Sequence, residues 1–300
     1  MDVRHLDLLR ELEDRGSVTA VAAATHRTPS AVSQQLRSAE RAFAATLVEA
    51  HGRGVRLTDA GRVLAASARD VAVALAAAEA RWHEFRGSAA GVVTIAALPS
   101  AATFLLPGVL RDLADEPIEV VCTDLDIAEA AYAGQVVDHD IVIAHSAHRT
   151  PPHAEGLLVR QLAREPLDIA MAADHPLAAR GSVTPQDLVA WPWIGVPLGY
   201  PFDSVRLAVE EATGTRVDVR QRVRDNRLAE ALVGAGECVA VLPRFTAPAG
   251  DEVVLRPLAT IESGRHVVAI LRPDRAERRA VRRVLSSLTT VASGFDPQCG

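Results

Sequence analysis

Residues 25–40, THRTPSAVSQQLRSAE, constrain the fold of this chain more than any other segment. Thr28 can cap a helix with its hydroxyl, and Pro29 suits the first helical position, where its missing N–H costs nothing. Apolar residues then recur at steps of four, three and four, which predicts one buried stripe: Val32, Leu36, Ala39 and Phe43. The opposite stripe is polar and consists of Ser30, Ser33, Gln34, Arg37 and Arg41. The segment is therefore predicted to be an amphipathic helix with a face of hydrogen-bonding side chains.

The preceding residues complete a small helical module. The leucine pattern predicts a first helix over about residues 4–15, ended by Gly16. Ser17 or Thr19 can cap a second, Ala-rich helix that runs to about residue 26. Only a short turn separates this helix from the one that begins after Thr28. Two helices joined so tightly, the second with a polar face, are typical of the helix-turn-helix that presents a recognition helix to DNA.

A hairpin and a local positive charge follow this module. The segment LVEAHGRGVRLTDAG has two Gly around Arg53 and then alternating Val55 and Leu57, which predicts a small β-hairpin, or wing. Five Arg stand against two Glu in residues 26–56, a net charge of +3, whereas residues 1–25 carry −2. Arg53 and Arg56 can therefore meet the phosphates of a neighbouring groove.

The short side chains near the start of the polar helix can donate and accept hydrogen bonds at the edges of bases, and the arginines can contact phosphates. A polar helix face by itself is as typical of a solvated surface as of a DNA contact. The helical module around it favours the DNA-binding interpretation. The residues that we predict to contact DNA are Ser17, Thr19, Thr28, Pro29, Ser30, Ser33, Gln34, Arg37, Arg53 and Arg56.

A long helix is predicted after the wing, capped by Thr58 and stopped by Gly87. Its apolar residues are spaced alternately by four and three and form a heptad seam: Leu64, Ala68, Val71, Leu75, Ala78, Trp82 and Phe85. Such a seam favours pairing of two copies of the helix, so we expect a homodimer. The alternative is that the helix packs entirely on its own chain.

Residues 4–62 resemble the winged helix-turn-helix of LysR-type transcriptional regulators, in the run LLRELEDRGSVTAVAAATHRTPSAVSQQLRSAE and then GRGVRLTDAGRVL. The resemblance implies linker helices that pair antiparallel and place two recognition helices on an imperfect palindrome of double-stranded DNA. It also implies a homotetramer and a contact with RNA polymerase. Pro29 stands where the family commonly has Gln and Ala50 where it has Arg, so one base contact and one phosphate contact of the family are not carried over.

The remaining two hundred residues alternate β-branched runs with helical segments. VVTIAAL, IEVVCT, DIVIA, LDIAMAA, WIGVP and ECVAVLP are the predicted strands. The alternation predicts an α/β domain with largely parallel sheets, whose ligands lie beyond the carboxyl ends of the strands. DHPLAARGSVTPQDL and LVGAGECVAVLP are similar to segments of the LysR-type regulatory domain. That resemblance implies two subdomains like those of periplasmic binding proteins, joined by two crossing strands, with a small effector between them.

The predicted fold is thus α/β with an all-α winged helix-turn-helix domain at its amino end. We place the DNA-binding domain at residues 1–58, the linker and dimerisation helix at 59–88 and the effector-binding domain at 89–300. Within the last, subdomain I covers about 89–163 and 268–300, and subdomain II covers about 164–267.

Polar residues at predicted strand ends and helix starts are candidates for effector contact. A strand runs through Pro99 into Ser100, where free N–H groups of a helix start favour anions. The resemblance singles out Ser100, because the family uses the hydroxyl or amide at this junction. Each polar candidate can equally be a helix cap. The candidates are Ser100, Ala101, Thr103, His145, Leu198, Gly199, Tyr200, Asp225 and Pro243.

Other features restrict the class of protein. The chain has no run of 18 apolar residues and its amino terminus is charged, so we expect a cytoplasmic protein without a membrane partner. Three Cys without CxxC spacing indicate buried thiols rather than a zinc site or disulfides. Four His lie between His139 and His153, where a solvated loop is favoured over a metal site. No metal and no cofactor other than the effector is expected.

Three functions remain to be compared. The first is a sequence-specific DNA-binding transcriptional regulator whose activity a small effector modulates. The second is an α/β enzyme acting on a small metabolite with an accessory helical domain, but ALPSAAT lacks the Gly-x-Ser-x-Gly elbow and no Gly-rich phosphate loop follows a strand. The third, a solute-binding transport component, would need export, for which no leader is seen. The regulator is the favoured hypothesis, with the effector, the operator and the sign of regulation left open.

Overall fold

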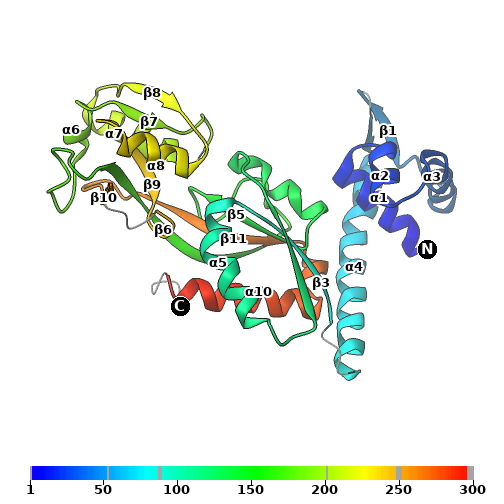
Figure 1. The fold of residues 1–300 in the computed structure, drawn as a ribbon. Coiled ribbons are helices and arrows are strands. Elements are labelled where there is room, and N and C mark those ends of the chain that lie inside the picture. The colour runs from blue at the N-terminus through cyan, green and yellow to red at the C-terminus, as the bar shows by residue number, and fades with distance from the viewer. Residues whose placement is uncertain (1, 53, 87–89, 201, 248–251, 296–300) are drawn as a thin grey trace. The chain divides into compact units, whose positions relative to one another are not determined.

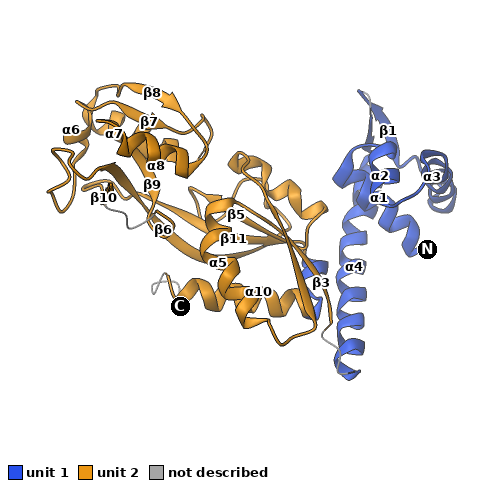
Figure 2. Cartoon of the chain, in the orientation of Figure 1, with its two compact units in different colours: residues 1–88, 273–279 blue, residues 89–272, 280–300 orange. Residues whose placement is uncertain are grey.

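The structure is a computed structural model that describes residues 2–52, 54–86, 90–200, 202–247 and 252–295. The chain divides into two compact units, coloured separately in Figure 2. Unit 1 comprises Met1–Ser88 with Pro273–Arg279, and unit 2 comprises Ala89–Arg272 with Ala280–Gly300.

Unit 1 begins with the three helices α1 (Val3–Arg15), α2 (Val18–Ala24) and α3 (Pro29–Phe43), which confirm the predicted module (Figure 1). Gly16 ends α1 with a φ of 68°, a conformation that glycine adopts without steric cost. The α2 helix ends two residues earlier than predicted, and His26 in the following turn has a φ of 52°. The Thr28 hydroxyl accepts a hydrogen bond from the Ala31 amide at 3.2 Å, so it caps α3 as predicted.

The core of this module is made by the predicted apolar stripes. Leu9, Val32 and Ala39 are fully buried, and α1 packs on α4 as well as on α3. The wing is an antiparallel hairpin of β1 (Val48–His51) and β2 (Gly54–Leu57), as predicted. Burying these side chains holds α3 in a fixed orientation and leaves its polar stripe on the surface.

The predicted long helix is α4 (Asp59–Phe85), capped by Thr58, whose hydroxyl accepts from the Gly61 amide at 3.1 Å. A Cβ at Gly61 would lie 2.2 Å from the Leu47 carbonyl oxygen, so only glycine permits this approach of α4 to the wing. The predicted stop at Gly87 lies outside the described residues. The short helix α9 (Pro273–Ala276), which no sequence pattern predicted, also belongs to unit 1, where Arg10 Nη1 lies 3.1 Å from Asp274 Oδ2.

Unit 2 is built on a sheet in the order β4-β3-β5-β11-β6-β9-β7-β8, with β10 paired to β6. Its strands are β3 (Gly91–Ala97), β4 (Ile118–Asp124), β5 (Ile141–Ser146), β6 (Leu158–Ala172), β7 (Trp193–Gly195), β8 (Val219–Arg222), β9 (Val239–Pro243), β10 (Val253–Arg256) and β11 (Gly264–Leu271). The helices are α5 (Pro99–Asp112), α6 (Pro185–Leu188), α7 (Phe202–Thr213), α8 (Asn226–Gly234) and α10 (Arg279–Ser293), with two 3-10 turns, η1 (Glu129–Ala131) and η2 (Ala133–Val137).

The prediction of largely parallel sheets needs correction. The pairs β3–β4, β3–β5, β7–β8 and β7–β9 are parallel, as expected from the helical crossovers. The pairs that β6 and β11 make with each other and with β5, β9 and β10 are antiparallel. β11 and the first half of β6 were not predicted, because their charged residues interrupt the apolar pattern. These two strands lie side by side in the sheet.

Burial inside unit 2 is centred on its sheet. β5 is buried along its whole length, and β9 likewise. β4 lies at one edge of the sheet and is largely exposed, and Cys122 on it is exposed, contrary to the buried thiol that we expected. Cys238 is partly buried, and Cys299 lies outside the described residues.

Candidate DNA interface and ligand cavity

The polar stripe of α3 lies on the surface of unit 1. Ser30, Gln34 and Arg37 are exposed, and Ser33 is half-buried. Thr28 Oγ1 lies 3.0 Å from Ser30 Oγ, and both precede or begin the first turn of α3. The helix thus presents hydroxyl and amide groups at its amino end and a guanidinium further along, which is the order that base and phosphate contacts require.

The remaining predicted DNA contacts occupy caps and the wing. Ser17 accepts from the Ala20 amide at 3.0 Å, so it caps α2, and Thr19 is exposed in the first turn. Arg56 on β2 is exposed and its Nη2 lies 2.6 Å from Glu49 Oε1. Arg53 lies outside the described residues.

Gln35, which the sequence analysis passed over, fixes the orientation of α3. Its Nε2 donates to the Arg4 carbonyl at 2.6 Å, and its Oε1 accepts from Arg27 Nη1. Gln34 and Gln35 therefore have different roles: the first faces outward, and the second ties α3 to α1. The only sequence signal for this division is the step of 100° between neighbouring helix positions.

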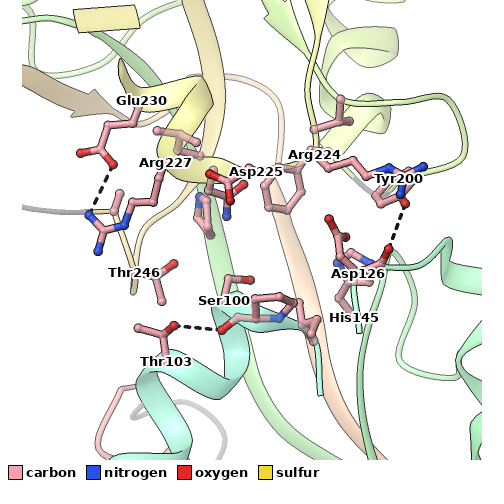
Figure 3. Close-up of a pocket in the computed structure, with 18 of the residues that line it drawn as sticks. Ser100, Thr103, Asp126, His145, Tyr200, Arg224, Asp225, Arg227, Glu230 and Thr246 are labelled. Atoms are coloured by element: carbon pink, nitrogen blue, oxygen red, sulfur yellow. Dashed lines mark hydrogen bonds and ion pairs between the residues drawn. The ribbon is translucent and has the colours of Figure 1, made fainter. Parts of the chain in front are cut away.

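Unit 2 contains a cavity of about 160 Å³ where β3, β5 and β9 end and where α5 and α8 begin. Figure 3 is a close-up of this cavity in which most of the polar lining residues are labelled. Apolar residues form much of the wall: Leu98, Pro99, Val196, Phe202, Leu242, Pro243 and Ala247. The polar lining consists of Ser100, Thr103, Asp126, His145, Tyr200, Arg224, Asp225, Asn226, Arg227, Glu230, Thr246 and Arg265.

Six of the nine residues predicted to bind an effector line this cavity: Ser100, Thr103, His145, Tyr200, Asp225 and Pro243. The other three do not. Ala101 is fully buried in the core, Leu198 is 70% exposed, and Gly199 lies in the turn beside it with a φ of 86°. The Ala101 side chain is inside α5's packed face because successive helix positions diverge by 100°.

A buried ion pair adjoins the cavity, and its Arg265 belongs to the lining. Arg265 and Glu165 face each other across β11 and β6, are 1% and 0% exposed, and lie 2.5 Å apart between Nη2 and Oε2. The second carboxylate oxygen of Glu165 accepts from the Phe245 amide at 2.9 Å. Arg265 Nη2 also donates to Ser100 Oγ at 2.8 Å, and the guanidinium stands 5.2 Å from the centre of the Phe202 ring. The charge of Arg265 is therefore balanced inside the protein, as a buried charge requires.

His145 is held beside this ion pair in a defined protonation state. Its Nδ1 is 3.4 Å from Arg265 Nη1, and since a guanidinium only donates, Nδ1 is the accepting nitrogen. Burial, and secondarily the charge of Arg265, lowers the His145 pKa to about 3, so the ring is neutral at pH 7 with its proton on Nε2. That Nε2 is buried and has no hydrogen-bond partner among the described residues.

The opposite side of the cavity carries charges of both signs. Asp225 caps α8 by accepting from the Leu228 amide at 2.8 Å, and Arg227 lies 3.7 Å from Glu230. The Arg224 guanidinium stands 5.9 Å from the centre of the Tyr200 ring. Burial raises the pKa of Asp126, which the charge of Arg224 partly offsets.

Five charged lining residues were not predicted from the sequence: Arg265, Asp126, Arg224, Arg227 and Glu230. Arg265 lies on a strand that was not predicted, and the others lie in loops or a short helix where no pattern fixes the direction of a side chain. The available signal for Arg265 was a charged residue at the start of the apolar run GRHVVAIL, which demands a buried partner.

Within the described residues there is no group of three or more His, Cys, Asp or Glu side chains placed to hold a metal ion. Of the predicted histidine cluster, only His145 lines the cavity, and His139 Nδ1 lies 3.2 Å from the Gln135 carbonyl oxygen. No helix in the described ranges is long and apolar enough to cross a membrane.

A helix-turn-helix module on the same chain as a cavity of ligand size is typical of a DNA-binding regulator that responds to a ligand. Known proteins support this class. Residues 3–62 match the bacterial regulatory helix-turn-helix protein, lysR family, and residues 86–293 match the LysR substrate binding domain. The chain belongs to the LysR family of transcriptional regulators, and it is a sequence-specific DNA-binding regulator with an effector-binding domain.

Two curated relatives are regulators. The small neutral protease regulatory protein of Streptomyces coelicolor A3(2) is 30% identical over 261 residues, which cover 85% of this chain and 77% of that protein. The nitrogen assimilation regulatory protein nac of Escherichia coli K12 is 26% identical over 251 residues, with 82% and 80% covered.

Solved structures share the fold. A full-length OxyR variant from Pseudomonas aeruginosa superimposes with a TM-score of 0.66 at 20% identity, covering 96% of this chain and 94% of that one. Full-length CbnR in complex with its target DNA gives a TM-score of 0.55 at 19% identity, covering 97% and 100%. The predicted family and fold class are confirmed.

Proposed function

We propose that α3 lies in the major groove and that Ser30, Ser33 and Gln34 contact base edges there. Arg37, with Arg53 and Arg56 of the wing, contacts phosphates, and Ser17, Thr19, Thr28 and Pro29 lie against the backbone at the groove's edge. The exposure of the polar α3 stripe supports this assignment, as does the solved DNA complex of CbnR, whose fold this chain shares. Each good base contact contributes about 1–3 kcal/mol of discrimination.

Two copies of the chain pair through the carboxyl-terminal half of α4 and place two α3 helices on an imperfect palindrome. Support comes from the seam residues Leu75, Trp82 and Phe85, which are 51%, 57% and 82% exposed, an unusual exposure for large apolar side chains. The dimers form a tetramer and contact RNA polymerase, as the family resemblance implies. The protein binds DNA in this function, so it acts in the bacterial cytoplasm.

The cavity of unit 2 holds the small-molecule effector. The effector binds one conformation of the protein more tightly than another and so shifts the balance between two states with different affinity for DNA. We assign residues 1–58 to DNA binding, 59–88 to pairing and 89–300 to effector binding, with subdomain limits near 163 and 267. The six predicted residues that line the cavity support this assignment.

The effector leaves the cavity chemically unchanged. Within the described residues Ser100 Oγ accepts from Arg265, and because a guanidinium cannot take a proton from a hydroxyl, this contact does not make Ser100 a nucleophile. The curated relatives are named as regulators, which also supports binding of the effector without its conversion. Mass spectrometry of a binding compound recovered after incubation with the protein would reveal turnover, and turnover would overturn this part of the proposal.

The DNA assignment is tested by a DNase I footprint of the purified protein on the region upstream of its own gene. Ser33 and Gln34 are changed together to Ala. We expect the double variant to lose at least tenfold of its preference for the protected site over unrelated DNA, because two base contacts per protomer are removed.

A matched control changes Ser286 and Gln221, which are exposed in unit 2, to Ala. The control is expected to keep the wild-type footprint and preference. If the double variant in α3 kept the same preference as this control, α3 would not be the element that distinguishes DNA sequences.

A further inference from the structure

The walls of the cavity contain donors at one side and an unused acceptor at another. Ser100 Oγ accepts from Arg265 at 2.8 Å, so its own proton is free to be donated. His145 Nε2 carries a proton, is buried and has no partner among the described residues. An unsatisfied buried donor costs free energy, and a bound acceptor would recover it.

Asp126 supplies the acceptor. Its carboxylate lines the cavity but accepts no hydrogen bond within the described part of the chain, while its backbone carbonyl accepts from Tyr200 Oη at 3.4 Å. The Tyr132 ring packs 5.4 Å from His145. Burial raises the pKa of Tyr132, and the nearby charge of Asp126 adds to that rise. Figure 3 draws Asp126, His145 and Ser100 among the residues that line this one cavity.

The charges of the cavity do not favour a simple anion. Arg265 is neutralised by Glu165 at 2.5 Å, and Arg227 lies 3.7 Å from Glu230. The three lining arginines are matched by three lining carboxylates, and Glu165 behind them adds one more negative charge. A ligand with only a carboxylate would therefore meet donors without a net positive field, and it would leave the Asp126 carboxylate without a hydrogen-bond donor.

Resting on the proposed effector function, we propose that this site takes a small amino-acid-like zwitterion. Its carboxylate accepts from Ser100 Oγ–H and His145 Nε2–H, and its ammonium group donates to Asp126. A cavity of about 160 Å³ is close to the size that holds benzene, so the ligand has roughly six to nine non-hydrogen atoms. Val196, Phe202 and Leu242 leave an apolar space for a short side chain.

The test compares three matched sets of compounds on the full-length protein by titration calorimetry. The first set is alanine, serine, valine and leucine. The second set consists of the same skeletons without the amine: propanoate, 3-hydroxypropanoate, 3-methylbutanoate and 4-methylpentanoate. The third set is the corresponding amines without the carboxylate. We expect at least one amino acid to bind at least tenfold more tightly than its deaminated and its decarboxylated counterparts.

Variants identify the residues responsible. Asp126→Asn should abolish the tenfold preference for the amino acid over its deaminated counterpart, whereas Asp124→Asn, an exposed carboxylate outside the cavity lining, should keep it. His145→Phe should weaken the amino acid and the deaminated acid equally, by at least tenfold. If that variant fails to fold, Ser100→Ala is expected to weaken both acids in the same way.

Three results would overturn the zwitterion proposal: no amino acid binds, the deaminated acids bind as well as the amino acids, or Asp126→Asn keeps the preference. Footprints in the presence of each compound separate this failure from failure of the effector function. If a simple acid alters the footprint and no amino acid does, the effector function stands and the ligand class is wrong. If compounds bind in the cavity and none alters DNA binding, the effector function itself is wrong.

Discussion

At the scale of single residues, the properties of the cavity depend on one buried ion pair. Arg265 and Glu165 neutralise each other, and Arg265 in addition donates to Ser100 and to His145. Because a guanidinium has only donors, both neighbours must accept from it, and their own protons then point elsewhere. The arginine acts as a positioning residue that turns a hydroxyl and an imidazole into donors, without offering its own charge to a ligand.

The state of His145 predicts how stability depends on pH. Burial lowers its folded pKa to about 3, whereas the unfolded value is about 6.5, so below pH 6.5 the unfolded chain takes up a proton that the folded chain does not. Stability is fully present above pH 6.5 and falls by about 1.4 kcal/mol per pH unit as the pH decreases toward 3. Urea unfolding should show that the wild type loses about 2 kcal/mol more than His145→Asn between pH 7 and pH 5.

His153→Asn is the control for that comparison. His153 is an exposed loop histidine with a φ of 59°, a conformation that Asn tolerates. We expect this variant to follow the wild-type pH profile. Equal pH slopes for the wild type and His145→Asn would mean that His145 is protonated as easily in the folded chain as in the unfolded one.

At the scale of elements, the two halves of the heptad seam on the long helix α4 differ in burial. Leu64 and Ala68, at its amino end, pack inside unit 1. Further along, Leu75, Trp82 and Phe85 are exposed, and the Trp82 and Phe85 rings stack with their centres 5.7 Å apart. Within unit 1 the second half of the seam is therefore left exposed, which favours pairing of two copies over the alternative that α4 packs entirely on its own chain.

Leu75→Asp tests pairing through this exposed half. A charge in the middle of an apolar helix interface leaves a buried, unpaired carboxylate in the dimer, so we expect monomers by sedimentation velocity and DNA affinity reduced at least tenfold. Val63→Asp is the control, since Val63 is 66% exposed on another face of α4 and should leave the assembly unchanged. An unchanged assembly state for Leu75→Asp would show that the chains associate elsewhere.

At the scale of the whole molecule, charge is distributed unevenly along an acidic chain. The net charge is −6, which opposes indiscriminate binding to nucleic acid, while residues 26–56 carry +3 around α3 and the wing. DNA affinity should therefore come from few phosphate contacts, so that base contacts contribute a large share of the binding free energy.

Arg56→Gln tests this balance. Each phosphate contact contributes about 0.9 to the slope of log K against log salt, so losing one per protomer should flatten the slope by roughly two in a dimer. Specific and unrelated DNA should weaken equally, because a phosphate contact carries no sequence information. Fluorescence anisotropy at several salt concentrations measures both, with Arg220→Gln in unit 2 as the control. A slope identical to that of the wild type would mean that Arg56 stays paired with Glu49 when DNA is bound.

Local patterns predicted the DNA-binding module well, because each of its signals acts over a few residues. The cap at Thr28, the left-handed Gly16 and the stripe from Val32 to Phe43 are fixed by short-range geometry. In unit 2 the same kind of reasoning found the apolar strands and the starts of α5 and α8. It failed for β11, where Arg265 interrupts the apolar pattern, because the partner that permits a buried charge lies a hundred residues away at Glu165.

The sequence by itself determined the family, the helix-turn-helix with its polar face, the long helix with an apolar seam, and an α/β domain with Ser100 and His145 at ends of its elements. Only the tertiary structure decided that β6 and β11 run antiparallel through the sheet, that Arg265 is neutralised by Glu165, and that Asp126 stands in the same cavity as His145. The physical reason is range: capping and periodicity depend on neighbouring residues, whereas the charge and hydrogen-bonding capacity of a cavity depend on which distant side chains the fold brings together.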